Sequence, residues 1–434
     1  MPTISDYFKQ AQLALGAYAN MLPGVANTQE LQRAGFSVTQ ANQYGDKWIV
    51  LDQFSDRGSG LSATVFKEIS TGKSYLAIRG TDDLVDLATD LINIGLVGTT
   101  ALQPQYLILR AKVQAWMSSG TLPARFTVTG HSLGGFLAIG IAAEFSANVE
   151  HTYLYNAPGL NGLLGIATAP ILRALRIAAP IGSGKVSNIR ADVGVSPIAA
   201  LGAQVALPMR IVIENQFNSD VPNPPAARNH SQEPLTDALA LYALFSAIDP
   251  SISVCQMGDL LKAASAKNNR TLEGSLDSLR QIFGFSESTQ TEQRESFYSN
   301  LYSLQTSPLF QSIANTEAGS NASAGRIVSL VGMDANQLAS NSRSDFGYLF
   351  ALNTLSPFAV MRAGDIFSAM HGELYGQWQA DLSLTAADRA AGRGNFSDSY
   401  LQDRAQFLVW KNQKNINDLA DGVSILRKDH GAES

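Results

Sequence analysis

The chain has little of several features that define whole classes of protein. Its 434 residues include a single cysteine, Cys255, so no disulfide can form within the chain and no zinc site can be built from cysteine ligands. We expect this cysteine to be a buried, small apolar residue. No run of lysine or arginine is present and the formal net charge is −6, which argues against a nucleic-acid partner.

Targeting and membrane-spanning segments are also missing. The first 21 residues lack the basic start, long apolar core and cleavage site of a secretory signal peptide. We therefore expect secretion or delivery by a route without a cleaved signal, from a bacterial source. The apolar stretch 159–184 contains two prolines and two arginines, and is too interrupted for a transmembrane span. It predicts either a buried helical connection or an amphipathic flap, and the flap would make peripheral contact with a membrane.

Charged residues are scarce at 16%, against roughly 25% in an average soluble domain, which suits contact with apolar substrates. Hydrophobic residues make up 45%, so a sizeable core can be buried. The length exceeds that of an average domain and favours two units, a catalytic domain over 1–245 and a mainly helical region over 246–434. No fixed-period repeat occurs, and the sequence does not indicate structural calcium because glycine- and aspartate-rich nonapeptides are absent.

The hydrophobic pattern predicts an α/β fold for the first half. A helix over 7–21, capped by Ser5 or Asp6, precedes three strands in hairpin-like succession. Strands then alternate with helices, which favours a mostly parallel central sheet flanked by helices. The predicted strands are 47–54, 61–69, 74–80, 125–130, 152–156, 186–191 and 209–216, and the predicted later helices are 104–117 and 136–146. Helical patterns dominate from residue 236 onward.

The motif that carries chemistry is Gly130-His131-Ser132-Leu133-Gly134, which joins a β-rich run directly to a helix. A serine in such a sharp turn adopts a strained conformation, and glycine two positions before and after it avoids a clash between strand and helix. The turn predicts Ser132 as a nucleophile at the helix N-terminus. The backbone amide of Leu133 then faces the developing oxyanion.

A serine nucleophile needs a histidine base, oriented by a carboxylate, later in the chain. His230 has the expected position after the strand 209–216, whereas His371 is a weaker candidate, His151 follows the nucleophile helix too closely and His430 lies in the tail.

For the acid, Asp192 directly follows the strand 186–191, at the sheet edge where the nucleophile turn opens. Asp220 competes with it, one strand later. A second oxyanion donor is expected from Thr81, in the turn after the strand 74–80, where it can also cap the following helix. No metal or cofactor is expected to be required for catalysis.

The segments AIRGTDD, VTGHSLGG and YNAPG, together with the Asp192 loop and His230, resemble the fungal-type (class 3) lipase family of α/β-hydrolases over residues 61–244. The stretch after His230 is also similar to the lipase portion of large bacterial secreted lipases. The resemblance implies an α/β-hydrolase fold and a lid over residues 84–97 that opens at lipid interfaces. This chain departs from the larger pattern in lacking the calcium-binding repeats and in having Asp192-Val193-Gly194 after the strand.

Together these features predict a serine-dependent carboxylic-ester hydrolase, either a triacylglycerol lipase or a phospholipase A1, that acts on lipid esters through an acyl-enzyme. Two alternatives remain open. One is a non-catalytic lipid-binding or partner-binding protein on a hydrolase fold. The other is a thioesterase or polyester hydrolase, which would prefer soluble or polymeric esters to dispersed lipids.

Overall fold

The computed structural model describes residues 2–56, 58–80, 104–159, 183–192, 204–214, 230–265, 271–286, 294–314 and 325–420. The predicted lid over 84–97 lies outside the described residues, as does all of the apolar stretch 159–184 except its ends. The chain divides into two compact units, Met1–Leu239 and Ala240–Ser434.

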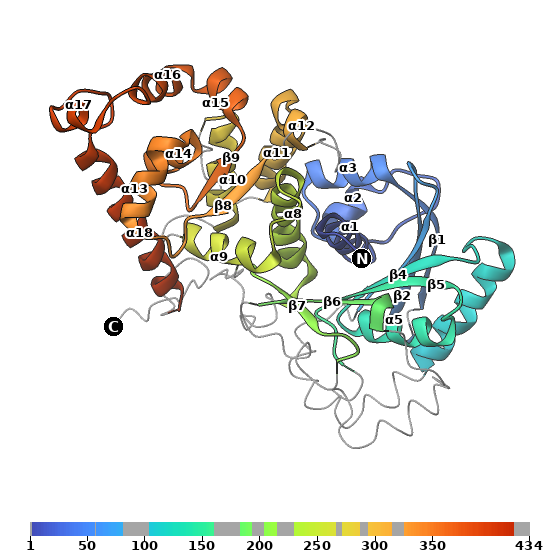
Figure 1. The fold of residues 1–434 in the computed structure, drawn as a ribbon. Coiled ribbons are helices and arrows are strands. Elements are labelled where there is room, and N and C mark those ends of the chain that lie inside the picture. The colour runs from blue at the N-terminus through green and yellow to red at the C-terminus, as the bar shows by residue number, and fades with distance from the viewer. Residues whose placement is uncertain are drawn as a thin grey trace, which may run out of the picture. The chain divides into compact units, whose positions relative to one another are not determined.

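The first unit is built on one seven-stranded sheet whose strands lie in chain order from β1 to β7 (Figure 1). The pairs β1·β2 and β2·β3 are antiparallel, and every later pair is parallel. The strands are β1 (Trp48–Asp56), β2 (Leu61–Glu68), β3 (Ser74–Ile78), β4 (Phe126–His131), β5 (Val149–Tyr155), β6 (Val186–Ala191) and β7 (Pro208–Ile211). The predicted mixed, mostly parallel sheet is therefore confirmed.

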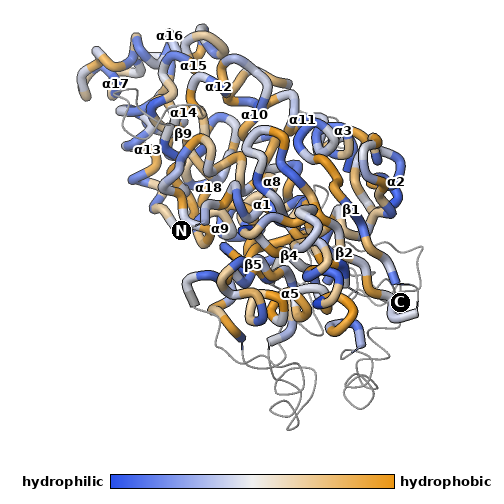
Figure 2. The backbone as a smooth tube through the Cα atoms, turned by 90° about the vertical axis from the view of Figure 1, so that its right-hand side faces the viewer, coloured by the Kyte–Doolittle hydropathy of each residue, from blue (hydrophilic) through white to orange (hydrophobic). Residues whose placement is uncertain are grey.

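Alternating side chains give this sheet two apolar faces, each covered by helices. On β3, Leu76 and Ile78 pack with α5 (Leu133–Glu144) and with the helical residues 104–119. Tyr75 and Ala77 point to the other face. That face is covered by α1 (Ile4–Gly16), α2 (Thr28–Arg33) and α3 (Val38–Lys47). In Figure 2 hydrophobic segments run through α5 and the neighbouring strands. The helices thus enclose the sheet from both sides.

The first helix begins earlier than the sequence pattern predicts. Thr3, not Ser5 or Asp6, is its N-cap, and its hydroxyl accepts a hydrogen bond from the Asp6 amide at 3.2 Å. The Asp6 carboxylate in turn accepts one from the Thr3 amide at 2.8 Å, which completes a capping box. This reciprocal pair satisfies two amides at the helix start, so it prevails over caps that satisfy one. The helix ends at Gly16, before the predicted Met21.

The described residues of the second unit are mostly helical, as predicted, and include a two-stranded antiparallel sheet. The helix α8 (Gln232–Ile248) leads into it, and Phe245 packs edge-to-face against Phe358 at 5.3 Å. Its helices are α9 (Val254–Ala264), α10 (Thr271–Ile282), α11 (Arg294–Gln305), α12 (Pro308–Ala314), α13 (Ala335–Ser344), α14 (Phe346–Thr354), α15 (Gly364–Met370), α16 (Gly372–Asp381), α17 (Ala386–Ala390) and α18 (Asp398–Ala420). The strands β8 (Arg326–Ser329) and β9 (Phe358–Met361) form the sheet. The prediction of a buried cysteine is wrong, because Cys255 is exposed in the first turn of α9.

Candidate active site

Ser132 lies in a single-residue turn between a strand and a helix. The strand β4 ends at His131, and α5 begins at Leu133. Ser132 has φ 55° and ψ −128°, a backbone conformation that costs a non-glycine residue about 1–3 kcal/mol. Such strain persists only where the surrounding packing enforces it, and it is concentrated at functional sites. The geometry is that of the nucleophile elbow in an α/β-hydrolase fold.

The two glycines of the motif are required by close backbone contacts. A Cβ atom on Gly130 would lie 2.4 Å from the carbonyl oxygen of Gly134, which is where strand and helix cross. A Cβ atom on Gly134 would lie 2.2 Å from the carbonyl oxygen of Ile78, at the end of β3. Both neighbours are main chain and cannot rotate away. The glycines therefore let the elbow pack against itself and against β3.

His230 is the histidine that meets the serine. Its Nε2 lies 2.9 Å from the Ser132 Oγ, and both residues are about 1% exposed. Burial, and to a smaller extent the nearby His131, hold the pKa of His230 well below its ordinary value. The ring is therefore neutral near pH 7, and its Nε2 is able to accept the serine proton.

The carboxylate of Asp192 lies at the predicted edge of the sheet but has another partner. Asp192 directly follows β6, and its amide donates to the carbonyl oxygen of Ile211 at 2.8 Å. Its side chain accepts a hydrogen bond from Arg210 at 3.2 Å. The competing Asp220 lies outside the described residues. The structure thus brings Ser132 and His230 together and pairs Asp192 with an arginine.

A buried carboxylate that the sequence analysis missed lies at the same edge. Glu214 follows β7 by three residues and is 4% exposed. Buried carboxylates are rare and demand partners, so this residue is a third candidate for the acid. The available signal was a glutamate directly after an apolar strand, in the segment MRIVIEN.

Of the two residues predicted as oxyanion donors, Leu133 lies within the described residues and Thr81 does not. Leu133 is the first residue of α5, where backbone amides have no partner within the helix. Thr81 lies outside the described residues, but the preceding Gly80 packs directly against the elbow. A Cβ atom on Gly80 would lie 2.9 Å from the carbonyl oxygen of His131 and 3.1 Å from the Cβ of Ser132. Gly80, just after β3, therefore lies close to Ser132.

Two of the other candidate histidines, His371 and His151, have partners elsewhere. The His371 Nε2 lies 2.8 Å from the carbonyl oxygen of Gln281, in the second unit. The His151 Nε2 lies 2.9 Å from the Ser187 hydroxyl, on β5 and β6. His430 lies outside the described residues. Among the described residues, no group of three or more His, Cys, Asp or Glu side chains is arranged to hold a metal ion.

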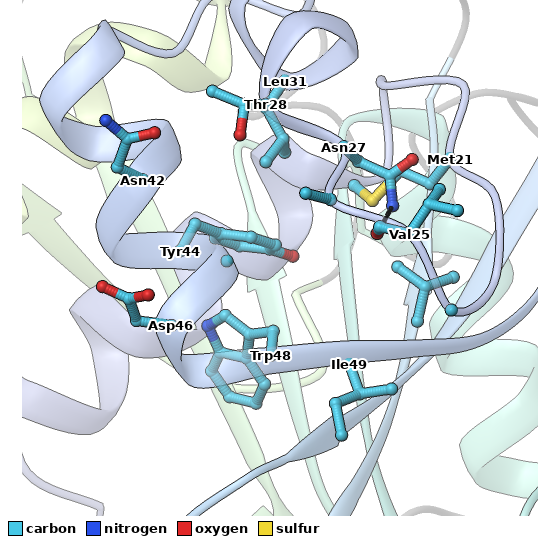
Figure 3. A pocket seen from close by; sticks show the side chains of 14 residues that line it. Met21, Val25, Asn27, Thr28, Leu31, Asn42, Tyr44, Asp46, Trp48 and Ile49 are labelled. Carbon is cyan, nitrogen blue, oxygen red and sulfur yellow. Dashed lines mark hydrogen bonds between the residues drawn. The ribbon is translucent and has the colours of Figure 1, made fainter.

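A separate cavity of about 620 Å³ lies at the opposite end of the sheet. Its wall includes Tyr44 from α3 and Trp48 from the start of β1 (Figure 3). Trp48 in β1 pairs with Glu68 in β2, and this pair lies level with the amino end of β3. The elbow, in contrast, lies beside the carboxyl end of β3, at Ile78. This cavity is therefore not part of the Ser132 site.

Comparisons with known proteins find likeness at the level of solved structures. No family model and no curated protein sequence matches the chain. The structure of Lip2 lipase from Yarrowia lipolytica matches with 19% identity and a TM-score of 0.31, over 44% of this chain and 72% of that one. Lipase II from Rhizopus niveus matches with 17% identity and a TM-score of 0.30, over 45% of this chain and 73% of that one.

Within the described residues, no helix is long and apolar enough to cross a membrane.

Proposed function

We propose that this protein is a serine-dependent carboxylic-ester hydrolase that releases fatty acids from lipids. The observation that carries the proposal is the pair formed by a strained serine at the elbow and a buried, neutral histidine 2.9 Å from its hydroxyl. A hydroxyl is unreactive at its own pKa, and an adjacent base within hydrogen-bond distance is what activates it. We also propose that residues 1–245 form the catalytic domain.

In the proposed mechanism the His230 Nε2 takes the Ser132 proton while the Oγ attacks the ester carbonyl. The carbonyl oxygen becomes an oxyanion, which the amides of Leu133 and Thr81 bind. His230 then returns the proton to the leaving alcohol and an acyl-enzyme remains. Water, deprotonated by His230, attacks the acyl carbon. The bond between that carbon and the Ser132 Oγ then breaks, His230 returns the proton to the Oγ, and the fatty acid leaves. None of these steps calls for a metal or cofactor.

The imidazolium that forms during attack requires a carboxylate at its Nδ1. We propose Asp192 for this role, with Asp220 and Glu214 as competitors. Asp192 is bound to Arg210 through an exposed guanidinium, a pair that contributes little stability and can be exchanged at small cost. Glu214 differs from Asp192 in being buried, at 4% exposure.

A lipid substrate is proposed because the resemblance to class 3 lipases over residues 61–244 accompanies a chain with few charged residues. Triacylglycerol lipase and phospholipase A1 share the elbow chemistry and differ in the lining of the acyl cleft. Action at a lipid interface and secretion belong to the same proposal.

The experiment measures fatty-acid release from a triacylglycerol emulsion and from phosphatidylcholine vesicles labelled at sn-1 or sn-2, with Ser132→Ala as the control. Release that depends on Ser132 supports the proposal. Dominant triacylglycerol cleavage identifies a lipase, and sn-1 cleavage a phospholipase A1. Turnover of short soluble esters alone would point to a thioesterase or polyester hydrolase. No release from any ester would favour a non-catalytic binding protein.

A further inference from the structure

The carbonyl oxygen of His230 accepts hydrogen bonds from two buried side chains. The Nε2 of His131 lies 2.7 Å from it, and the Nδ2 of Asn156 lies 3.1 Å from it. These donors are 1% and 0% exposed. Because a carbonyl oxygen has two lone pairs, these bonds use its full accepting capacity. The main chain of the proposed base is therefore held from the ends of β4 and β5.

Asn156 is itself fixed by its surroundings. It has φ 46°, in the left-handed region that asparagine tolerates better than most residues. Its amide donates to the carbonyl oxygen of Ile189 at 2.9 Å, and its side-chain oxygen accepts from the amide of Ala191, also at 2.9 Å. These two bonds direct the Nδ2 toward His230. Both come from β6, so the end of that strand also helps to fix Asn156.

The protonation state of His131 follows from its two partners. A carbonyl oxygen can only accept, so the Nε2 of His131 carries a proton. Burial lowers the pKa of His131 to about 4, so near pH 7 the ring is neutral and its Nδ1 is an acceptor. The hydroxyl of Tyr18, 2.7 Å away, therefore donates to that Nδ1. Tyr18 stabilises the one neutral tautomer of His131 that can donate to His230.

We propose that Tyr18 and His131 are positioning residues that hold His230 at hydrogen-bond distance from Ser132. This inference rests on the proposed function, since it gives the two residues a role in the same reaction. His131 precedes the nucleophile in β4, so its side chain ties the base to the strand that carries the serine. A displacement of about 1 Å between reacting groups can cost about a hundredfold in rate.

The first helix supports the same arrangement. Tyr18 follows α1, and the carbonyl oxygen of Gln10 in that helix accepts a bond from the Thr129 hydroxyl on β4 at 3.3 Å. The carbonyl oxygen of Ala11 accepts one from the Gln232 side chain, at the start of α8, at 3.2 Å. Thus α1 binds both the strand before Ser132 and the helix after His230.

The test compares two phenylalanine variants, each of which removes one tyrosine hydroxyl beside α1. Tyr18→Phe removes the donor to His131. Tyr155→Phe is the matched control, because the Tyr155 hydroxyl donates to the carbonyl oxygen of Tyr7 at 2.5 Å and does not bond to either histidine ring. Thermal unfolding of both proteins checks that they lose stability to a similar extent. Steady-state kinetics on a short soluble ester then separate kcat from KM.

We expect Tyr18→Phe to lower kcat by about tenfold to a hundredfold with KM nearly unchanged, because geometry between base and nucleophile acts on the chemical step. Tyr155→Phe should keep the wild-type kcat. His131→Leu should lose at least as much as Tyr18→Phe, and His131→Gln should recover most of the loss because its side-chain amide can donate to the His230 carbonyl.

Three results would overturn the positioning role. They are a wild-type kcat in Tyr18→Phe, an equal loss in Tyr155→Phe, and no recovery in His131→Gln relative to His131→Leu. An active wild-type enzyme with any of these results leaves the proposed function intact and removes only the inference. A wild-type protein that hydrolyses no ester overturns both.

Discussion

Substitution of Gly134 by alanine tests whether the elbow is packed as tightly as the structure indicates. The new methyl group would lie 2.2 Å from the Ile78 carbonyl oxygen, and main chain cannot move aside as a flexible side chain can. Overpacking of this kind costs about 1–3 kcal/mol or more. Because the contact at 2.2 Å is with main chain, the cost lies in the upper part of this range, at about 2–3 kcal/mol. Alanine is favoured over glycine inside a helix by about 1 kcal/mol, so the net loss of unfolding free energy is about 1–2 kcal/mol.

Gly45 provides the matched control for this substitution. It lies inside the helix α3 and is exposed, and a Cβ atom there would meet nothing within 4 Å. Gly45→Ala should therefore stabilise the first unit by about 0.5–1 kcal/mol, through helix propensity alone. The same substitution is therefore expected to lower the unfolding free energy at Gly134 and to raise it at Gly45.

Scanning calorimetry measures both effects. For a unit of this size about 1 kcal/mol shifts Tm by about 2–4 °C, so Gly134→Ala should lower the Tm of the first unit by about 2–8 °C. Ester turnover should fall as well, because separation of β3 from α5 would displace the turn at Gly80 that packs against Ser132. A Gly134→Ala protein with wild-type or higher Tm would refute the packing argument.

Three further predictions concern the titratable groups. His230→Ala should lower kcat by about 10³-fold or more on a soluble ester, and near-normal turnover would exclude His230 as the base. Among Asp192→Asn, Asp220→Asn and Glu214→Gln, the variant of the true acid should lose about 10⁴-fold in kcat while the others lose little, and equal activity of all three would remove the carboxylate from the mechanism. Acid should destabilise the first unit, because the unfolded chain binds a proton at His131 near pH 6.5 whereas the folded chain does so only near pH 4. The loss from this residue is about 2 kcal/mol at pH 5, and a Tm unchanged between pH 7 and pH 5 would contradict it.

The sequence predicts those parts of the molecule that depend on local pattern. The elbow is identified from five consecutive residues, because the spacing of Gly130 and Gly134 around Ser132 follows from sterics within a single turn. The strands β1 to β6 are found because their alternating or continuous apolar residues differ from the turns between them. The pairing of His230 with Ser132 follows from their order in the chain.

The parts that were missed depend on contacts distant in sequence or on buried polar residues. The helix α3 was not predicted, because its buried positions include a fully buried glutamine, Gln40, and its interior includes Gly45. Both residues interrupt the apolar stripe by which an amphipathic helix is recognised in a sequence. The bond between Tyr18 and His131 joins residues 113 positions apart, and no local pattern indicates it. The acid is undecided by sequence, because carboxylates follow two neighbouring strands and the chain path after each strand decides which one reaches His230.

The most direct test of the central claim is reaction of the protein with a fluorophosphonate probe, followed by mass spectrometry of the labelled peptide. The account predicts one covalent adduct per chain, located on Ser132, absent from Ser132→Ala and formed much more slowly in His230→Ala. No adduct on the wild-type protein, or an adduct on another residue that persists in Ser132→Ala, would contradict the assignment of Ser132 as an activated nucleophile.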